Sequence, residues 1–358
     1  MYKYYPVLVS KDSELSALSR LEHKVKLVIT PVLQIITLDS TKGGGKRQNR
    51  KSKLEKLNEF LAKHWSFQGN QIVLDFSLLP NLEANHSVVE GLFKLCRDNG
   101  VNVMPSVRYA NEFDTNYKGL LRRLISKGGS NICIRLSKAS YGFGNVRDQV
   151  SEILDGLKVD KARVVVLIDA GYIDKDSHEE VVDEIKDCAL NLPSGLEGWR
   201  DIVVATGSFP QNLGRFEPAR AAQPIARYEW GIWNKLVNDR GLSSAIKYGD
   251  YATKHPAHED VDGYSASISV KYSAEHEYVI YRGVISKKHE HGHGQYIIHA
   301  GELVKSKYYE SSDFCWGNLQ ISEISKLSLG TARRGMGSPQ TWLAYSLNHH
   351  ITLVESLL

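Results

Sequence analysis

The sequence has few cysteines, no long apolar run and no recognisable leader. Its 358 residues include only 4 cysteines, no two of which have a CxxC spacing, and this usage is typical of reduced, buried thiols. No apolar run approaches the ~20 residues that a membrane-spanning helix needs. The first ten residues (MYKYYPVLVS) begin directly with a strand-like pattern and lack the features of a signal peptide. Together these absences predict a cytoplasmic protein that has no membrane partner.

Two catalytic signatures are also missing. Residues 42–53 (KGGGKRQNRKSK) form a basic, glycine-rich stretch, but no GK[ST] opens the following helix, so a P-loop is not indicated. We expect this stretch to be either a solvated loop or a lid that contacts an anionic ligand. Ser208 lies in ATGSFP and lacks the Gly-x-Ser-x-Gly context of a serine nucleophile. The net charge of +4 is too small to indicate nucleic-acid binding by itself, and it does not exclude it.

Short β-branched runs alternate with helical patterns along most of the chain. The helical patterns have apolar residues three or four apart, for example at residues 88–96 and 181–190. The strand-like runs are at residues 4–10 (YYPVLVS), 25–35 (VKLVITPVLQI), 71–77 (QIVLDFS), 102–109 (NVMPSVRY), 131–137 (NICIRLS), 162–170 (ARVVVLIDA), 201–208 (DIVVATGS) and 245–251 (AIKYGDY).

Eight repeats of strand then helix favour a closed barrel over an open sheet. The predicted fold is therefore α/β, a (β/α)8 TIM-like barrel, and such barrels typically take about 250 residues. We expect one domain over residues 1–358 with a small antiparallel elaboration after the eighth strand, at residues 260–300. Its strands are predicted at residues 266–272 (ASISVKY), 278–285 (YVIYRGVI) and 295–299 (QYIIH). Residues 322–358 have a helical pattern and are expected to close the barrel.

Polar residues stand where the apolar strands end. Strands buried on both faces are nearly all apolar, so a charge at a strand end must be solvated, paired or used for function. The carboxyl ends of the strands form the functional face of such a barrel. We therefore expect Asp75, Arg108, Arg135, Asp169 and Asp250 to converge on one mouth. Pairing of these charges with one another is the structural alternative.

The arginines favour an anionic ligand at this mouth. A guanidinium group grips a phosphate or carboxylate through two parallel hydrogen bonds, whereas aspartates alone suit acid–base chemistry or a divalent cation. Aromatic rings nearby offer stacking surfaces. The predicted ligand-binding residues are Asp75, Arg108, Arg135, Asp169, Ser208, Tyr248, Asp250, Tyr251 and Arg282. No catalytic residue and no cofactor are identified.

The histidines of residues 287–294 (KKHEHGHG) and His299 do not indicate a metal site. Alternate residues of a strand face one way, so three imidazoles could converge on a metal ion. The stretch nevertheless lies in a glycine-bearing turn preceded by lysines and has no cysteine ligands beside it. We expect this loop to be solvated.

Four segments resemble the beta-protein family of bacteria and their phages. They are residues 5–18, which contain YPVLVSK and ELxAL, residues 205–210 (ATGSFP), residues 248–251 (YGDY), and Trp342 followed by His349 and His350. The resemblance is spread over nearly the whole chain and implies a barrel. It also implies an association with mobile elements and with conflict between phage and host. It supplies no catalytic residues.

Two hypotheses about function follow. In the first, the barrel binds a phosphorylated or nucleotide-like anion at its mouth, with or without turnover. In the second, the barrel is a non-catalytic interaction module of phage defence or counter-defence that recognises a protein or nucleic-acid partner. A concave pocket with convergent Asp and Arg would favour the first hypothesis, and arginines spent on salt bridges would favour the second.

Overall fold

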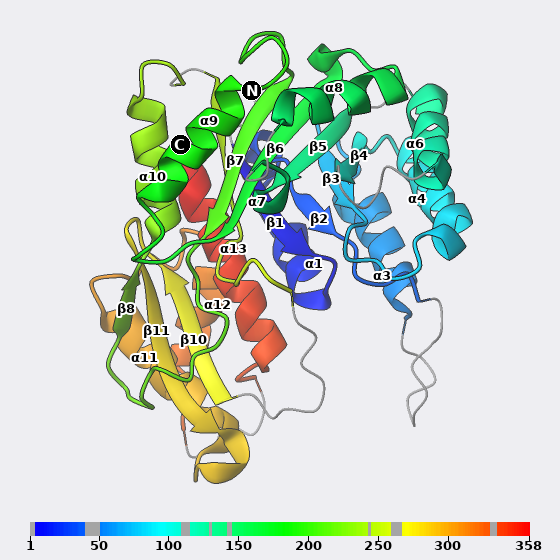
Figure 1. The fold of residues 1–358 in the computed structure, drawn as a ribbon. Coiled ribbons are helices and arrows are strands. Elements are labelled where there is room, and N and C mark those ends of the chain that lie inside the picture. Colours follow the sequence, from blue (N-terminus) through cyan, green and yellow to red (C-terminus); the bar gives the residue numbers. More distant parts are fainter. Residues whose placement is uncertain are drawn as a thin grey trace.

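Eight parallel strands close into a barrel, which confirms the predicted fold. In the computed structural model the order around the barrel is β1-β2-β3-β4-β5-β6-β7-β9, and β9 pairs with β1 (Figure 1). The structure describes residues 4–39, 51–108, 115–128, 131–141, 145–242, 245–258, 267–329 and 335–358. The barrel strands are β1 (Tyr4–Val9), β2 (Val32–Gln34), β3 (Ile72–Asp75), β4 (Val103–Arg108), β5 (Ile132–Ser137), β6 (Val164–Tyr172), β7 (Asp201–Gly207) and β9 (Ile246–Asp250).

One of the eight predicted runs divides into two elements. The first part of the run at residues 25–35 is helix α2 (His23–Val28), and only Val32–Gln34 pair as β2. The chain is already extended at Ile29, and Pro31 disfavours a helical conformation in the residue before it. Short apolar runs fit a buried helix turn as well as a strand, and here Val25 packs into the core from the helix.

Helices cover the outside of the barrel. After α1 (Asp12–Ser19) and α2 come α3 (Lys53–Glu59) with the π-helical turn Phe60–His64, α4 (His86–Asp98), α6 (Thr115–Gly128), α7 (Lys138–Tyr141), α8 (Val146–Leu157), α9 (Glu180–Leu190) and α10 (Tyr228–Asn238). Helix α4 buries Val89, Leu92, Phe93 and Cys96, which are three or four residues apart and so form one face. The basic stretch at residues 42–50 lies outside the described residues, so its predicted role stays a prediction.

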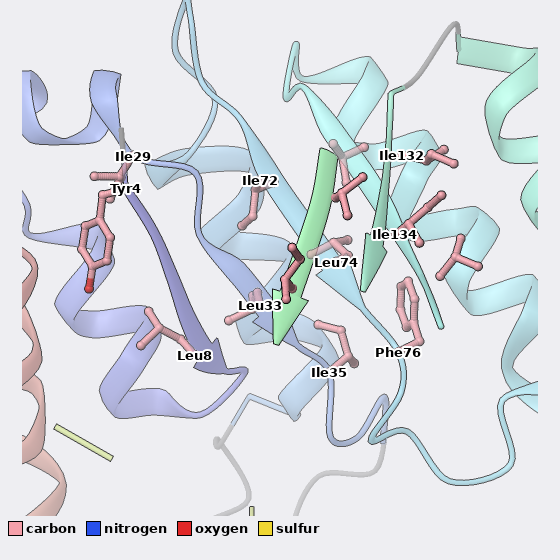
Figure 2. Close-up of a cluster of buried hydrophobic side chains, with 14 of the residues drawn as sticks. Tyr4, Leu8, Ile29, Leu33, Ile35, Ile72, Leu74, Phe76, Ile132 and Ile134 are labelled. Carbon is pink, nitrogen blue, oxygen red and sulfur yellow. The ribbon is translucent and has the colours of Figure 1, made fainter. Parts of the chain in front are cut away.

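Alternate residues of each strand point to two separate cores. Leu8, Leu33, Leu74 and Ile134 belong to the large core between strands and helices, part of which is drawn in Figure 2. Their neighbours in the strands fill the barrel itself, as successive side chains of a strand point to opposite faces. This inner core consists of Tyr5, Val7, Val32, Val73, Met104, Cys133, Val165, Leu167, Val203, Ala205 and Tyr251.

A three-stranded antiparallel sheet lies beside the barrel (Figure 1). Two of its strands, β10 (Ser267–Ser273) and β11 (Glu277–Ile285), are those predicted after the eighth barrel strand. The third predicted strand is wrong, because residues 295–299 open helix α11 (Gln295–Lys305), which buries Tyr296, Ile297, Ala300 and Leu303. The place of that strand is taken by β8 (Gln223–Ala226), which precedes the last barrel strand and pairs with β11.

Two further helices complete the chain. Helix α12 (Trp316–Ser325) precedes α13 (Pro339–Leu357), which begins with Ser338 as its N-cap and Pro339 in its first turn, a favourable start for a helix. The α13 side chain of Asn348 donates a hydrogen bond of 3.1 Å to the carbonyl of Ala17 in α1. In the described part of the chain, no helix is both long enough and apolar enough to span a bilayer.

The contact between α12 and α13 yields a test of the packing. A Cβ added at Gly317 would lie 2.3 Å from the backbone oxygen of Tyr345, so the two helix backbones approach too closely for any side chain. We expect Gly317→Ala to lower the free energy of unfolding by about 1–3 kcal/mol. Urea unfolding followed by circular dichroism measures this change.

The matched control is Gly91→Ala in the exposed face of α4, where nothing lies within 4 Å of an added Cβ. Because alanine is the better helix former, this change should raise the stability by up to about 1 kcal/mol. Equal effects of the two substitutions would contradict the packing described for α12 and α13.

Candidate functional site

Five of the predicted residues lie together in one layer inside the barrel. The buried guanidinium group of Arg135 lies between two carboxylates: its Nε donates to Asp169 Oδ2 at 2.9 Å, and its Nη1 donates to Asp75 Oδ2. Its Nη2 donates to the hydroxyl of Tyr251 at 2.8 Å, and that hydroxyl donates to Asp169 Oδ1 at 2.6 Å. The Nη2 of Arg108 lies 3.8 Å from Asp75 Oδ2. We call these five residues the inner ring.

The inner ring neutralises its own charge. It sets the guanidinium groups of Arg108 and Arg135 against the carboxylates of Asp75 and Asp169. Burial by itself raises the pKa of Asp75, but Arg135 and Arg108 hold that pKa below its usual value. The Asp75 carboxylate is therefore ionised and paired at neutral pH. An arginine already held by two carboxylates has little attraction left for a ligand anion, so the structural alternative describes Arg135 better than ligand binding does.

Asp250 points away from the inner ring, to the outside of the barrel. Its Oδ1 accepts the hydroxyl of Tyr4 at 2.6 Å, and its Oδ2 lies 2.8 Å from His350 Nε2 and 3.0 Å from the Tyr248 hydroxyl. Arg227 Nη2 is 3.8 Å from the same oxygen. Although burial opposes ionisation, His350 and Arg227 lower the pKa of Asp250 to about 2. Asp250 and Tyr248 thus hold a helix and a loop against the barrel.

Glu229 and Ser208 belong to the same group of buried polar residues as Asp250 and Arg227. We call this group outside the barrel the outer cluster. The buried carboxylate of Glu229 accepts a hydrogen bond from Tyr278 at 2.5 Å and another from Ser208, and it lies 3.3 Å from Arg227 Nε. Ser208 also accepts the backbone N–H of Tyr228 at 3.2 Å, at the start of α10. These bonds fix how the chain leaves β7, and they give Ser208 a structural partner rather than a ligand.

Arg282 belongs neither to the inner ring nor to the outer cluster. It is near the end of β11, and its Nη1 donates to the backbone oxygens of Gly214, at 3.3 Å, and Phe216. The nine predicted residues therefore divide between the inner ring, the outer cluster and the accessory sheet. The reason is the two-residue period of a strand: Asp75, Arg108, Arg135 and Asp169 share the inward parity, whereas Tyr248 and Asp250 have the outward parity.

A cavity of about 180 Å³ opens at the carboxyl ends of the strands. Its walls come from Lys11 after β1, Gln34 at the end of β2, Phe209 after β7, and Tyr251 and Lys254 after β9. Tyr251 belongs to both the cavity and the inner ring: it lines the mouth cavity, and its hydroxyl bonds to Arg135 and Asp169. Further lining comes from Val7, Leu8, Val9, Pro210, Gln211, His255, Pro256, Ala257, His258 and Lys271.

The mouth cavity is lined by cations. Among the described lining residues there are three lysines, Lys11, Lys254 and Lys271, and no carboxylate. The ammonium group of Lys254 pairs at 2.6 Å with the buried Glu14, which stands behind the wall. The ammonium group of Lys271 lies 4.6 Å from the centre of the Phe209 ring. Burial and the neighbouring Lys254 lower the pKa of Lys271 to about 8.

The lysines of the mouth cavity were not among the predicted site residues. The prediction rests on residues at the strand ends, whereas Lys11 and Lys254 lie two to four residues beyond the ends of β1 and β9. Lys271 comes from the accessory sheet, where it is the one charged residue among the polar positions of ASISVKY. That lone lysine was the available signal. The described residues include no group of three or more His, Cys, Asp or Glu arranged to hold a metal ion.

Comparison with known proteins confirms the family resemblance. The family described as Beta protein matches residues 4–355 of this chain. Protein beta of Enterobacteria phage P4 is 20% identical over 368 residues, a match that covers 98% of this chain and 92% of the phage protein.

Similar solved structures include two enzymes. A mutant tryptophan synthase α-subunit from Pyrococcus furiosus has a TM-score of 0.40 and 14% identity over 70% of this chain and 89% of its own. A dihydropteroate synthase from Anaplasma phagocytophilum has a TM-score of 0.37 and 11% identity over 71% of this chain and 94% of its own. Likeness at this level carries no argument about ligand or activity.

The inner ring gives a prediction about stability. Arg135→Met removes the guanidinium group and leaves the carboxylates of Asp75 and Asp169 facing each other in a buried site. Breaking a buried ion pair in this way costs about 3–5 kcal/mol, so we expect a loss of that size in urea unfolding.

The control is Arg123→Met, which breaks the surface ion pair between Arg123 and Glu90 at 2.7 Å. Both side chains of this pair are more than a third exposed. Exposed pairs of this kind contribute about 0–1 kcal/mol. A stable Arg135→Met protein that binds anions less well would contradict the structural role and restore the predicted one.

Proposed function

This chain belongs to the Beta protein family, and we propose that it binds a compact anionic ligand, a phosphate group or a small phosphorylated molecule, in the mouth cavity. The observation that carries the proposal is the lining: Lys11, Lys254 and Lys271 reach one cavity that no described carboxylate lines. Like charges do not gather around a concave site without cost, and an anion between them offsets their repulsion.

The charge distribution supports this location above the inner ring. Glu14 offsets the charge of Lys254 from behind, which leaves the cavity positive on balance. Burial, and to a lesser extent the charge of Lys254, lower the pKa of Lys271, so an anion beside its ammonium group would offset both effects. An oxyanion at hydrogen-bond distance would restore that pKa and would gain charge-assisted hydrogen bonds in return.

The size of the cavity limits the ligand. Its volume of about 180 Å³ is below the ~300–1,000 Å³ of pockets that enclose drug-sized molecules. A phosphate, or the phosphorylated end of a larger molecule, matches this space better than a whole nucleotide does. The rings of Phe209 and Tyr251 add apolar faces for the remainder of such a ligand. The phage origin of Protein beta supports a setting in the conflict between phage and host.

The first test is a substitution in the wall of the mouth cavity. Each charge-assisted hydrogen bond to an anion contributes about 1.5–3 kcal/mol, so Lys271→Gln should weaken the binding of inorganic phosphate or pyrophosphate about tenfold to a hundredfold. Isothermal titration calorimetry of the wild type and the variant measures the two affinities.

The control is Lys94→Gln, which removes an exposed lysine of α4 that pairs only with Asp98 across one helical turn in the described contacts. It should leave the affinity unchanged. Equal weakening by both substitutions would mean general charge attraction. No binding by the wild type would favour the alternative of an interaction module that recognises a macromolecular partner.

The second test uses pH. Lys271 has a pKa of about 8 in the folded protein, so its ammonium group is charged below that pH and neutral above it. Sulfate remains a dianion throughout, and its affinity should therefore be constant near pH 7 and fall progressively between pH 8 and 9.5. In Lys271→Gln the affinity should be weak and flat over the same interval. A decline of the same steepness in both proteins would assign the titration to another group.

A further inference from the structure

A second cavity lies on the accessory sheet and shares no lining residue with the mouth cavity. Its volume is about 260 Å³, and it lies between the end of β11, the loop that precedes β8, and the start of α11. The side chains that matter for its chemistry are Arg220, Arg282, His289, His291, Gln295 and His299. We call it the β11 cavity.

Two buried polar groups in the β11 cavity have no hydrogen-bond partner among the described residues. His299 is only 4% exposed, and neither of its ring nitrogens is bonded. The Nε of Arg282 is likewise buried and unbonded, although its Nη1 is used by Gly214 and Phe216. Buried polar atoms are nearly always hydrogen-bonded, so three such atoms on one cavity point to a group from outside the chain.

Gly283 lets the side chains of His299 and Gln295 pack directly against β11. A Cβ there would lie 3.1 Å from His299 Nε2 and 2.4 Å from Gln295 Oε1, so a glycine is needed beside the imidazole. The amide of Gln295 cannot satisfy His299, because it already bonds to the backbone of Val284 and Gly292. The imidazole is thus held in place by packing while its nitrogens remain unbonded.

The charges around the β11 cavity select the ligand. Arg220 and Arg282 bring two positive charges, and Glu290, whose exposed side chain pairs with His291 at 3.3 Å, brings one negative charge. The balance suits a monoanion. Burial, His289 and Arg220 lower the pKa of His299 to about 4, so its ring is neutral at pH 7 and presents one N–H donor and one acceptor nitrogen.

We propose that the β11 cavity binds a small monoanionic carboxylate. The carboxylate accepts hydrogen bonds from Arg282 Nε and from the ring N–H of His299. A planar carboxylate fits the edge of a guanidinium group, which gives the site its orientation. This site is independent of the anion proposed for the mouth cavity.

Nitrogen-15 NMR of the histidine rings in the whole protein tests the proposal with lactate as the probe. We expect lactate to shift the protonated ring nitrogen of His299, because its N–H gains a carboxylate partner. Acetate should shift the same nitrogen, because the carboxylate is the group that the site recognises. The mouth variant Lys271→Gln should leave the lactate titration unchanged.

Two substitutions complete the test. Arg220→Gln alters an exposed side chain, so it keeps the fold and should weaken lactate binding. His299→Phe keeps a ring in the packed position but removes the N–H donor, and it should weaken lactate binding as measured by isothermal titration calorimetry. Unperturbed His299 nitrogens at saturating lactate would overturn the proposal. Inorganic phosphate that shifts His299 at lower concentration than lactate does would overturn the assignment to a carboxylate.

Discussion

The buried ionic cluster around Arg227 is the interaction on which the rest of the structure depends. Arg227 lies near Asp250 at the end of β9 and Glu229 at the start of α10, and its Nη1 donates to the backbone oxygens of Ala274 and Glu275 at 2.9 and 3.1 Å. One guanidinium group thus joins the barrel to the turn between β10 and β11. Because a charge left alone in a buried site is strongly destabilising, none of these partners can be lost singly without loosening the accessory sheet.

The mouth cavity exists because that sheet is held in place. Lys271 of β10 completes a wall whose other members follow β1, β7 and β9 of the barrel. The charges lie at two levels: the inner ring pairs its arginines with its aspartates, and above it three lysines line the mouth cavity. The proposed anion site therefore lies on the solvent side of a layer whose charges are paired.

The accessory sheet contributes to both cavities. In β10, Lys271 faces the mouth, and in β11, which pairs with β10 through Lys271 and Ile280, Arg282 and Gly283 face the second cavity. The barrel therefore supplies a rigid frame, and the hairpin added to it brings the residues that distinguish the two sites. This division is common in barrels, where segments attached to the carboxyl ends of the strands carry the chemistry.

The sequence by itself determined the barrel, since strand and helix periods repeat locally and each run needs only its own residues to be recognised. It also determined that charges stand at the strand ends. Only the tertiary structure decided their partners: strand parity sent Asp250 outward to His350 and Asp169 inward to Arg135, contacts that span 100 and 34 residues of chain. Residues 295–299 form a helix, and β8 pairs with the edge of β11 at which a third strand was predicted. The place of Lys271 in the mouth cavity also depends on the tertiary structure, since β10 belongs to the accessory sheet and the other walls follow barrel strands. Pairing between distant segments is set by packing, which a local sequence pattern does not reveal.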